Sequence, residues 1–546
     1  MRSWLLVLVV LSGCATFIID GDDDDSAVPT ADDDDAANDD DAADDDDAAD
    51  DDDATPPPPP DSDGDGVIDE EDCDDEDPAI HPGAEETCNG IDDDCNDQID
   101  DLPAEEPEEP ILFAIIGDFG NGSIAEGLVA TMVKGWNPDF IITTGDNNYP
   151  DGEALTIDWN IGVHYSEYIY PYNGFLGTTP TVQENRFFPV LGNHDWKTTD
   201  AEPYIDYFTL PGNEYYYELV KGPVHFVMMD SNPEQPDGAT PDSVQGQWAQ
   251  AAFASSAAPW TIANFHHPPF NSGPGGNYAT MQWPFDQYGV DAVLTGHEHL
   301  YEQSTVDGVL YLMNGAGGAD IREFDRWEDF TVAQFEERNG AQRVYATSQW
   351  ITFDFFDTQL NIIDSVTLRQ GADANATTQL LAPGSTWSYL DSGQEETGWE
   401  TAGFDSTGWA TGAAPLGYAS GETTTVDYGP NDNAKYRATW FRSTFEVDSV
   451  CAVDHLLLRL IRDDGARVFL NGEEVFRTNM PDGVIGGNEF AASQISDGGP
   501  TTWLETWLPN DALVVGTNSI AVEVRQHSLT SSDLRFDLEL RAQLAE

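Results

Sequence analysis

The segment ILFAIIGDFG, residues 111–120, is an apolar run that stops abruptly at a carboxylate, Asp118. Five later apolar runs also stop at side chains of the types that bind metal ions. They are FIITT before GDNNY (140–149), FFPVL before GNHD (187–195), HFVMM before Asp230-Ser231 (225–231), TIANF before HHPP (261–269) and AVLT before GHEH (292–299). Short apolar strands are typical of buried sheet, and open α/β sheets place their chemistry at the C-terminal strand ends. We therefore expect these polar side chains to converge on one sheet edge, in numbers sufficient for two metal ions.

The order of the motifs carries a resemblance to a known family. GDFG, GDNNY, GNHD, a His before a Pro, and GHEH resemble, in this order, the motifs of the calcineurin-like metallophosphoesterases. The tyrosine of GDNNY and the run GHEHLYE (296–302) are similar to the purple acid phosphatases. The resemblance covers residues 111–370 and implies an α/β fold, a four-layer α-β-β-α sandwich. It also implies a binuclear-metal phosphoesterase that hydrolyses phosphate esters by attack of a metal-activated hydroxide.

Seven residues of these motifs are candidate metal ligands by the same resemblance. Asp118, Asp146, Tyr149 and His299 would bind a first metal ion, and Asp146 would bridge to a second ion held also by Asn193, His266 and His297. A phenolate is a hard ligand that suits ferric iron, so a ligating Tyr149 implies iron at the first site. The alternative is a core or lid tyrosine beside a zinc or manganese pair. The second ion could be zinc, iron or manganese.

His194 follows the predicted Asn ligand and is not itself a predicted ligand. In the family that the motifs resemble, this residue contacts phosphate and helps to protonate the leaving oxygen, which is a general-acid role. Asp195 would orient it. The structural alternative is a packed histidine with no catalytic part.

Contacts to substrate are less defined by the motifs. Many relatives carry another histidine soon after the Pro of the HHPP motif, but the segment NSGPGGN (271–277) contains none. His267, Asn277 and His164 are the candidates for substrate binding, with His164 in the aromatic insertion WNIGVHYSEYIYPY (159–172). For His164 a plain surface position is the alternative.

The charge of the chain excludes some partners. The formal net charge is −83, and the region from Asp20 to Pro110 holds 43 acidic residues with no Lys or Arg. Such a surface repels nucleic acid and anionic lipid headgroups, so neither is expected as a main partner. At 546 residues the chain is also too long for one core, so we expect three or more units.

The N-terminal 60 residues are expected to be an export signal and a tether. Residues 1–14 resemble a bacterial lipoprotein signal that ends in the lipidation residue Cys14, and an ordinary signal peptide is the alternative. Ala15 after the cysteine favours the outer membrane by the bacterial sorting pattern. Residues 15–60 are acidic and Pro-rich, a composition typical of disordered tethers. We expect an outer-membrane, cell-surface or extracellular protein that meets the membrane through its lipid anchor only.

Residues 61–102 form an Asp-rich module with cysteines. The segment from Asp61 to Asp72 fits the twelve-residue calcium-loop template, with the candidate calcium ligands Asp61, Asp63, Asp65, Asp69 and Asp72. A weaker second loop begins at Asp92 and includes Asp94, Asn96 and Asp100. The alternative for both is a solvated acidic run. Cys73, Cys88 and Cys95 lie close together, so at least one local disulfide is expected, and Cys451 is the fourth thiol of the mature chain.

Residues 371–546 show short alternating runs and the hairpin signal Asn471-Gly472, so we expect an all-β sandwich. Asp463-Asp464-Gly465 and the run VFLNG (468–472) resemble galactose-binding-like jelly-roll modules. Six tryptophans of this region could form a carbohydrate platform or a buried core: Trp387, Trp399, Trp409, Trp440, Trp503 and Trp507.

Two classes of function stay open from the sequence. The first is a membrane-tethered phosphoesterase. The second is a calcium-binding surface adhesion or scaffold protein whose phosphatase-like domain is inactive. All seven predicted ligands are present, and this favours the enzyme, because a decayed enzyme usually loses a ligand first.

Overall fold

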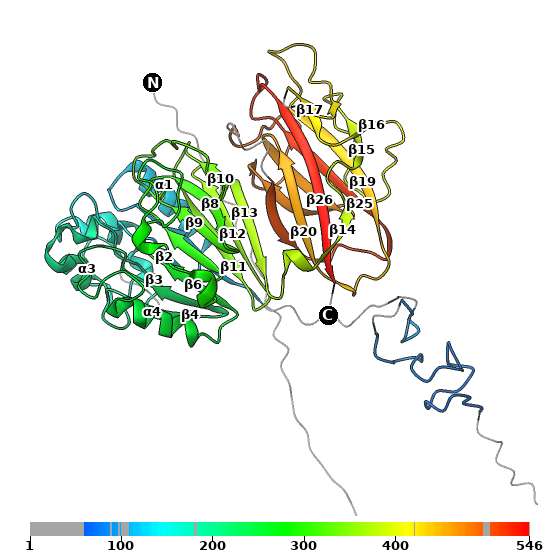
Figure 1. Cartoon of the computed structure of the whole chain (residues 1–546), viewed down its shortest axis with the longest axis horizontal. Coiled ribbons are helices and arrows are strands. Elements are labelled where there is room, and N and C mark those ends of the chain that lie inside the picture. The colour runs from blue at the N-terminus through cyan, green and yellow to red at the C-terminus, as the bar shows by residue number, and fades with distance from the viewer. Residues whose placement is uncertain are drawn as a thin grey trace, which may run out of the picture. The chain divides into compact units, whose positions relative to one another are not determined.

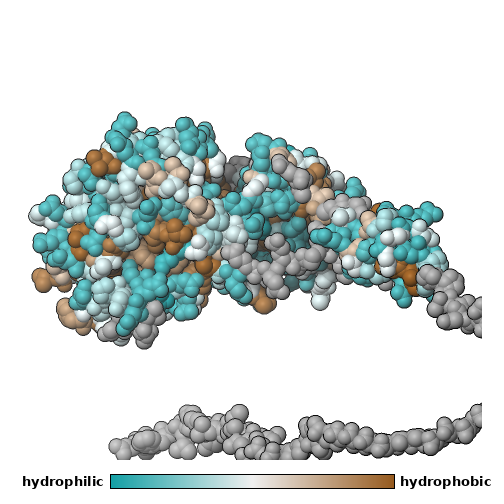
Figure 2. All heavy atoms as spheres, turned by 90° about the horizontal axis from the view of Figure 1, so that it is seen from below, coloured by the Kyte–Doolittle hydropathy of each residue, from teal (hydrophilic) through white to brown (hydrophobic). Residues whose placement is uncertain are grey.

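A computed structural model describes residues 59–87, 90–96, 99, 109–178, 183–419, 421–494 and 503–544. The predicted signal, Cys14 and the tether up to residue 58 lie outside the described residues, as do Cys88 and Asp100. No helix in the described ranges is long and apolar enough to cross a membrane. The face of the molecule in Figure 2 is largely hydrophilic, with apolar residues in scattered groups.

The first sheet contains the apolar run 111–116, which forms the strand β1. Its strands lie in the order β23-β13-β12-β11-β1-β2-β3. β1, β2 and β3 run parallel to one another, whereas β11 pairs antiparallel with β1. The bounds are β1 (Ile111–Ile116), β2 (Phe140–Thr143), β3 (Phe187–Phe188), β11 (Gly340–Ala346), β12 (Trp350–Asp357), β13 (Asn361–Arg369) and β23 (Met480–Pro481).

The second sheet has the strand order β10-β8-β9-β7-β6-β5-β4. β5, β6, β7 and β9 are parallel, and antiparallel strands close both ends. The bounds are β4 (Tyr217–Lys221), β5 (Val224–Met228), β6 (Trp260–Asn264), β7 (Ala292–Thr295), β8 (Tyr301–Val306), β9 (Val309–Asn314) and β10 (Thr331–Phe335).

The six apolar runs singled out in the sequence are the strands β1, β2, β3, β5, β6 and β7. They do not form one sheet, because three lie in each of the two sheets. The expectation of a single shared sheet edge is therefore wrong. The polar motifs instead come from the strand ends of two sheets that pack face to face.

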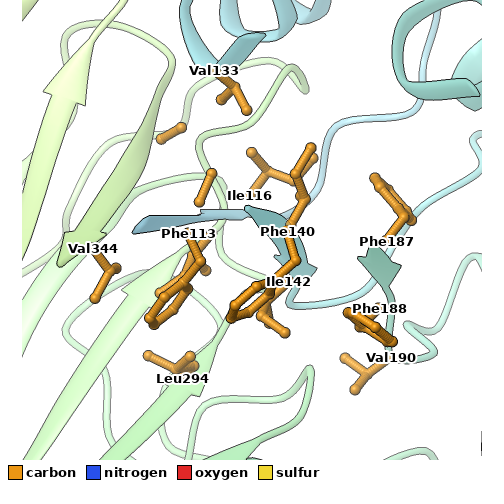
Figure 3. Packing of buried hydrophobic residues seen from close by; sticks show 14 of the residues in the cluster. Phe113, Ile116, Val133, Phe140, Ile142, Phe187, Phe188, Val190, Leu294 and Val344 are labelled. Carbon is orange, nitrogen blue, oxygen red and sulfur yellow. The ribbon is translucent and has the colours of Figure 1, made fainter. Parts of the chain in front are cut away.

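Aromatic packing joins the two sheets. Phe113 and Phe140 of the first sheet meet Phe226 of the second edge-to-face, with ring centroids 5.4 and 5.8 Å apart. Figure 3 shows Phe113 and Phe140 on the side of Leu294, with Val133 on the opposite side above Ile116. This alternation along β1 buries both faces of the strand.

Helices cover the outer faces of the two sheets. Val133 belongs to α1, whose Ser123 caps the first turn by accepting a hydrogen bond from the Glu126 amide. Ala249 and Phe253 of α4 pack against Val227 of β5. The order is thus helix, sheet, sheet, helix, and the predicted mixed α/β class is confirmed (Figure 1).

The remaining helical segments are short. The α-helices are α1 (Ile124–Trp136), α2 (Val163–Tyr165), α3 (Glu202–Tyr207) and α4 (Val244–Ala254). A π-helical turn, η1 (Asp158–Gly162), precedes α2. The 3₁₀ turns are η2 (Ser166–Tyr168), η3 (Asp195–Lys197), η4 (Thr199–Ala201), η5 (Ala279–Met281), η6 (Phe285–Tyr288) and η7 (Ala374–Ala376).

The C-terminal region is built from two six-stranded sheets with mainly antiparallel pairing. The path of one sheet is β18-β17-β26-β20-β24, with β14 paired to β26, and the other has the order β16-β15-β19-β25-β21-β22. The bounds are β14 (Thr377–Leu381), β15 (Thr386–Leu390), β16 (Ala410–Ala413), β17 (Leu416–Tyr418), β18 (Thr424–Thr425), β19 (Ala438–Val447), β20 (Val453–Arg462), β21 (Gly465–Leu470), β22 (Glu473–Thr478), β24 (Leu504–Leu508), β25 (Gly516–Arg525) and β26 (Leu534–Leu544).

The predicted hairpin turn and most of the tryptophans lie within the C-terminal sheets. Asn471 and Gly472 join β21 to β22 and have φ angles of 51° and 99°, as a two-residue hairpin turn requires. Four tryptophans are buried in the sandwich: Trp387, Trp399, Trp409 and Trp440. These four rings are therefore core and not a surface platform, whereas Trp503 and Trp507 are half-exposed.

Candidate metal centre

The first group of donor atoms surrounds the hydroxyl of Tyr149. The Tyr149 Oη lies 3.1 Å from Asp118 Oδ1, 3.0 Å from Asp146 Oδ2 and 3.2 Å from His299 Nε2. Asp118 follows β1, whereas Asp146 and Tyr149 follow β2. The loop after β7 supplies His299. The four residues predicted to hold a first metal ion are thus brought together.

This group contains more acceptors than protons. The His299 Nδ1 lies 2.9 Å from the carbonyl oxygen of Asp320, so Nδ1 carries the proton and Nε2 presents a lone pair to Tyr149. One phenolic proton must then serve two carboxylate oxygens and one imidazole nitrogen. A cation among these four side chains resolves the excess of lone pairs, so the donor set fits a metal ion.

A second group shares Asp146 with the first. The Asn193 Oδ1 lies 3.2 Å from His266 Nε2 and 2.9 Å from His297 Nδ1. The two imidazole nitrogens are 3.2 Å apart, and His266 Nε2 is 3.5 Å from Asp146 Oδ1. These are the four residues predicted for the second ion.

The same excess of lone pairs occurs in the second group. The His266 Nδ1 lies 2.9 Å from the Thr144 carbonyl oxygen and donates to it, which leaves Nε2 to present a lone pair once the imidazole is neutral. In that form Nε2 faces the amide oxygen of Asn193, another acceptor. A metal ion bound by Asp146, Asn193, His266 and His297 would satisfy all of these atoms.

Burial shapes the charges at the centre. Burial raises the pKa of Asp118, although His266 opposes the shift. Burial also acts to raise the pKa of Asp146, but His266 and His194 outweigh it and lower the pKa. Asp146 therefore stays ionised, and its negative charge is available to a shared cation.

The histidines at the centre differ in protonation. Burial lowers the pKa of His297 to about 3 and that of His299 to about 4. Burial alone would lower the pKa of His266, but Asp146 raises it to about 9. Neutral imidazoles are the form that binds metals, so His297 and His299 are ready as ligands and His266 would release a proton on binding.

The backbone is strained where it presents three of the candidate ligands. Asp118, Asp146 and His297 have φ angles of 53°, 52° and 73°, in the left-handed region that non-glycine residues seldom adopt. The glycines next to them allow close approach: a Cβ on Gly192 would lie 2.2 Å from the backbone nitrogen of Asp146. Strain of this kind is common at functional sites.

His194 lies beside both donor groups. Its ring packs 4.3 Å from that of Tyr149, and its Nε2 lies 3.9 Å from Asp146 Oδ2. The Nδ1 donates to the Pro150 carbonyl oxygen at 2.6 Å, and Lys197 Nζ donates to the same oxygen at 2.9 Å. This leaves Nε2 directed toward the centre, as a proton donor to a leaving group would need.

The structure does not bring the carboxylate of Asp195 into hydrogen-bond contact with the His194 imidazole. Its carboxylate accepts hydrogen bonds from the Gly192 amide at 2.9 Å and from the Asn147 side chain at 2.9 Å. These contacts hold the GNHD turn against the GDNNY turn. The imidazole of His194 is oriented by the Pro150 carbonyl oxygen, to which Lys197 also donates, and neither contact was expected from the sequence.

The three candidates for substrate binding have different surroundings. His267 is 93% buried, its Nδ1 lies 2.8 Å from Ser231 Oγ, and its ring is 4.6 Å from that of His297. Burial lowers its pKa to about 2, so this imidazole is neutral. His267 thus borders the second donor group.

The other two candidates make contacts away from the predicted ligands. Asn277 is exposed, and its Oδ1 accepts a hydrogen bond from the Asn271 amide, which closes the loop 271–277. The contacts of His164 are with α1, where its Nε2 lies 3.8 Å from Glu126 Oε1. The structure therefore does not bring His164 or Asn277 into contact with the donor groups.

Sequence reasoning missed Arg322, which lies next to the GHEH turn. Its Nη1 lies 2.8 Å from Glu298 Oε2, and its backbone N–H donates to the His299 carbonyl oxygen at 3.2 Å. The carboxylate of Glu298 is buried, whereas the Arg322 side chain is 41% exposed. No motif surrounds Arg322, so only the fold places this cation at the centre.

The Asp-rich module brings some of its predicted calcium ligands together. Asp61, Asp63 and Asp65 offer oxygen atoms within 4.8 Å of one another. The carboxylate of Asp69 instead accepts hydrogen bonds from the backbone and hydroxyl of Ser62, and that of Asp72 accepts from the Asp74 amide. The predicted five-residue set is therefore assembled only in its first three members.

The second loop of the module and the cysteines also assemble. Glu86, Asp92 and Asp94 form another cluster of oxygen donors, and Glu86 was not among the predicted ligands. Cys73 and Cys95 form a disulfide, which confirms the expected local bridge.

Comparison with known proteins finds relatives for the N-terminal half. Residues 96–301 match the model of the calcineurin-like phosphoesterase family, and residues 72–101 match the Cu-binding MopE model of a metal-binding motif. A purple acid phosphatase of Glycine max is 27% identical over 237 residues, which are 38% of this chain and 47% of the relative. Purple acid phosphatase 7 of Arabidopsis thaliana is 23% identical over 288 residues, or 46% of this chain and 84% of the relative. The chain thus spans about half the length of the first relative.

Among solved structures, the purple acid phosphatase PPD1 from yellow lupin (Lupinus luteus) seeds is similar, with a TM-score of 0.39 and 16% identity. The match covers 49% of this chain and 55% of that chain.

Proposed function

We propose that the domain homologous to the calcineurin-like phosphoesterases hydrolyses phosphate esters with two metal ions bound at the donor groups described above. One observation carries the proposal: two sets of facing lone pairs share the single carboxylate Asp146. That arrangement is the one that a two-metal site needs, with a bridging oxygen ligand and separate ligands on each side.

The roles of the protein side chains follow from the geometry. Two bound metal ions would lower the pKa of a water molecule and neutralise charge on a phosphoryl group. His194 would hold a proton at Nε2 and give it to the leaving oxygen, while the Pro150 carbonyl oxygen, held by Lys197, fixes the ring. Arg322 would add a positive charge for the phosphate group of the substrate.

We expect ferric iron at the Tyr149 site and zinc, iron or manganese at the other. Under this assignment Tyr149→Phe removes the visible phenolate-to-iron absorption, because the charge-transfer donor is gone. The unfolding temperature should shift by no more than about 4 °C, since one hydroxyl is lost. An absorption spectrum and a melting curve check both points. Tyr278→Phe, next to His267, is the matched control and should keep the colour.

Arg322 gives a prediction on substrate affinity. Arg322→Gln should raise KM for an aryl phosphate about tenfold, since a charge-assisted contact in a partly exposed place is lost. Metal content should stay at the wild-type level. Arg326→Gln is the control on the same segment, because Arg326 pairs with Glu328 and not with the GHEH turn. Equal KM values for both variants would remove Arg322 from the substrate site.

The test of the function is hydrolysis of 4-nitrophenyl phosphate and of its bis-ester by the metal-loaded protein. Release of nitrophenol, abolished by a chelator and restored by metals, supports the enzyme. The ratio of the two rates would separate a monoesterase from a diesterase. Metal loading without turnover of either ester would favour the alternative, a calcium-binding surface adhesion or scaffold protein.

The other parts of the chain suggest where the enzyme acts. We infer that Cys14 is lipidated and that the acidic segment tethers the enzyme to the bacterial outer membrane or cell surface, since residues 1–14 resemble a lipoprotein signal. The Asp-rich module would bind calcium, and the galactose-binding-like sandwich would dock on surface carbohydrate. Labelling with a fatty-acid probe in wild type and in Cys14→Ser tests the anchor.

A further inference from the structure

A cleft of about 710 Å³ is lined on one side by residues of β12 and β13, among them Trp350 and Arg369. On the other side it is lined by residues of β22 and β24. Side-chain alternation sets one wall of this cleft. Trp350 and Arg369 are cross-strand partners, as are Thr352 and Thr367, so the four side chains share one face of the sheet. Trp507 lies on the opposite wall. The volume is in the range typical of small-molecule sites.

Arg369 is the unusual member of this wall. It is half-buried, and its Nε has no hydrogen-bond partner. Within the described residues it forms no ion pair closer than 4 Å. Burial lowers the pKa of the guanidinium group, and Asp511 and Asp454 only partly offset this effect. An unpaired buried donor such as this Nε costs stability, so an anionic ligand that accepts from the guanidinium group would relieve the cost.

Among the charged side chains that line the cleft, Arg477 and Glu474 pair with each other, whereas Asp482 and Asp511 add negative charge to the lining. Arg477 donates to both carboxylate oxygens of Glu474, with distances of 2.5 and 2.9 Å. Further along the same sheet face, Arg343 Nη2 lies 3.1 Å from Asp354 Oδ2. Unlike these two arginines, Arg369 forms no ion pair within the described residues. This is unusual in a chain with 103 acidic and 20 basic residues.

Aromatic and hydroxyl groups line the cleft beside Arg369. Trp350 and Trp507 are both half-exposed, so parts of their rings are open to the cleft. The hydroxyls of Thr352 and Thr367 are 2.7 Å apart, and Thr506 Oγ1 accepts from the Thr367 amide at 3.2 Å. Flat apolar rings beside hydroxyl groups suit the apolar faces and hydroxyls of a sugar ring.

We propose that this cleft binds a saccharide that carries a carboxylate, with the carboxylate on Arg369 and the sugar rings against Trp350 and Trp507. The cleft contains none of the residues of the two donor groups. The proposal is thus independent of the phosphoesterase activity and gives the chain a separate site for acidic glycans.

The test is calorimetric titration of the full chain with galacturonate and glucuronate oligomers, with neutral galactose oligomers as the reference. The wild type should bind the acidic oligomers at least about tenfold more tightly than the neutral ones. Arg369→Gln should lose about ten- to hundredfold in affinity for the acidic oligomers, because a charge-assisted contact is removed. Arg369→Lys should keep part of the preference, and Lys221→Gln, a charge-matched change on β4, should keep all of it.

Trp507→Ala should weaken the binding of the acidic oligomers also, and melting curves establish that each variant is folded. Equal binding of acidic and neutral oligomers, or unchanged affinity in Arg369→Gln, would overturn the proposal. So would absence of binding to both acidic oligomers, or tighter binding of poly-glutamate, which would indicate a site for an acidic peptide.

Discussion

Asp146→Asn should remove both metal ions and lower kcat/KM by at least about three orders of magnitude. The reason is that Asp146 offers one oxygen to each donor group, Oδ2 to the Tyr149 side and Oδ1 to the His266 side. Loss of a bridging charge would weaken both sites, and two bound metal ions would supply several kcal/mol of transition-state stabilisation. Elemental analysis and an aryl phosphate assay on the same sample measure both effects.

We expect the Asp146→Asn variant to keep the wild-type fold. Asp146 has a φ angle of 52°, a conformation that asparagine also tolerates, and the amide oxygen can still accept from the His194 N–H. Asp151→Asn is the matched control, because Asp151 is exposed and its carboxylate forms an ion pair with Lys197 at 3.5 Å, away from the donor groups. Retention of two metal ions and full activity in Asp146→Asn would show that this carboxylate does not bridge.

His194→Ala should slow turnover by about 10²- to 10⁴-fold while metal content stays unchanged. The imidazole lies beside the donor groups, with its Nδ1 on Pro150 and its Nε2 free to serve a leaving group. The effect should shrink for esters with good leaving groups, because these need no proton. Rates for a series of phenols of different acidity, measured with elemental analysis, check the prediction.

His164→Ala provides the control for this substitution. His164 contacts α1 and should leave the rates at the wild-type level. Loss of metal from His194→Ala would count against the assigned role, since a general acid does not hold the ion.

The strands and the members of the two donor groups could be predicted from the sequence because each motif is local. An apolar run followed at once by GD, GNH or GHEH marks both the strand and its polar end, and each of the seven predicted ligands lies in one of the two donor groups. When a site is built from strand ends, its polar residues can therefore be predicted from each motif separately.

The pairing of the strands could not be predicted in the same way. β1 pairs with β11, more than 200 residues later, and no local pattern encodes that contact. The six runs consequently appeared to share one sheet edge, whereas they are divided between two sheets. Long-range packing of Phe113 and Phe140 against Phe226 brings the two sets of strand ends together.

The directions of the side chains in the turns also could not be predicted from the sequence. Asp195 follows His194 directly, but η3 turns its carboxylate toward Asn147 and Gly192. Conversely, Lys197 and Arg322 reach the centre from positions without a motif. Contacts between these side chains and the donor-group residues depend on the local turn and on the tertiary fold. They do not follow from the spacing of residues in the sequence.

Anomalous X-ray diffraction from crystals of the metal-loaded protein tests the central claim most directly. We predict two peaks in each molecule, one among Asp118, Asp146, Tyr149 and His299 and the other among Asp146, Asn193, His266 and His297. The energy of each absorption edge would identify the metal, with iron expected beside Tyr149. A single peak, or a second peak away from Asn193 and His266, would contradict a two-metal phosphoesterase.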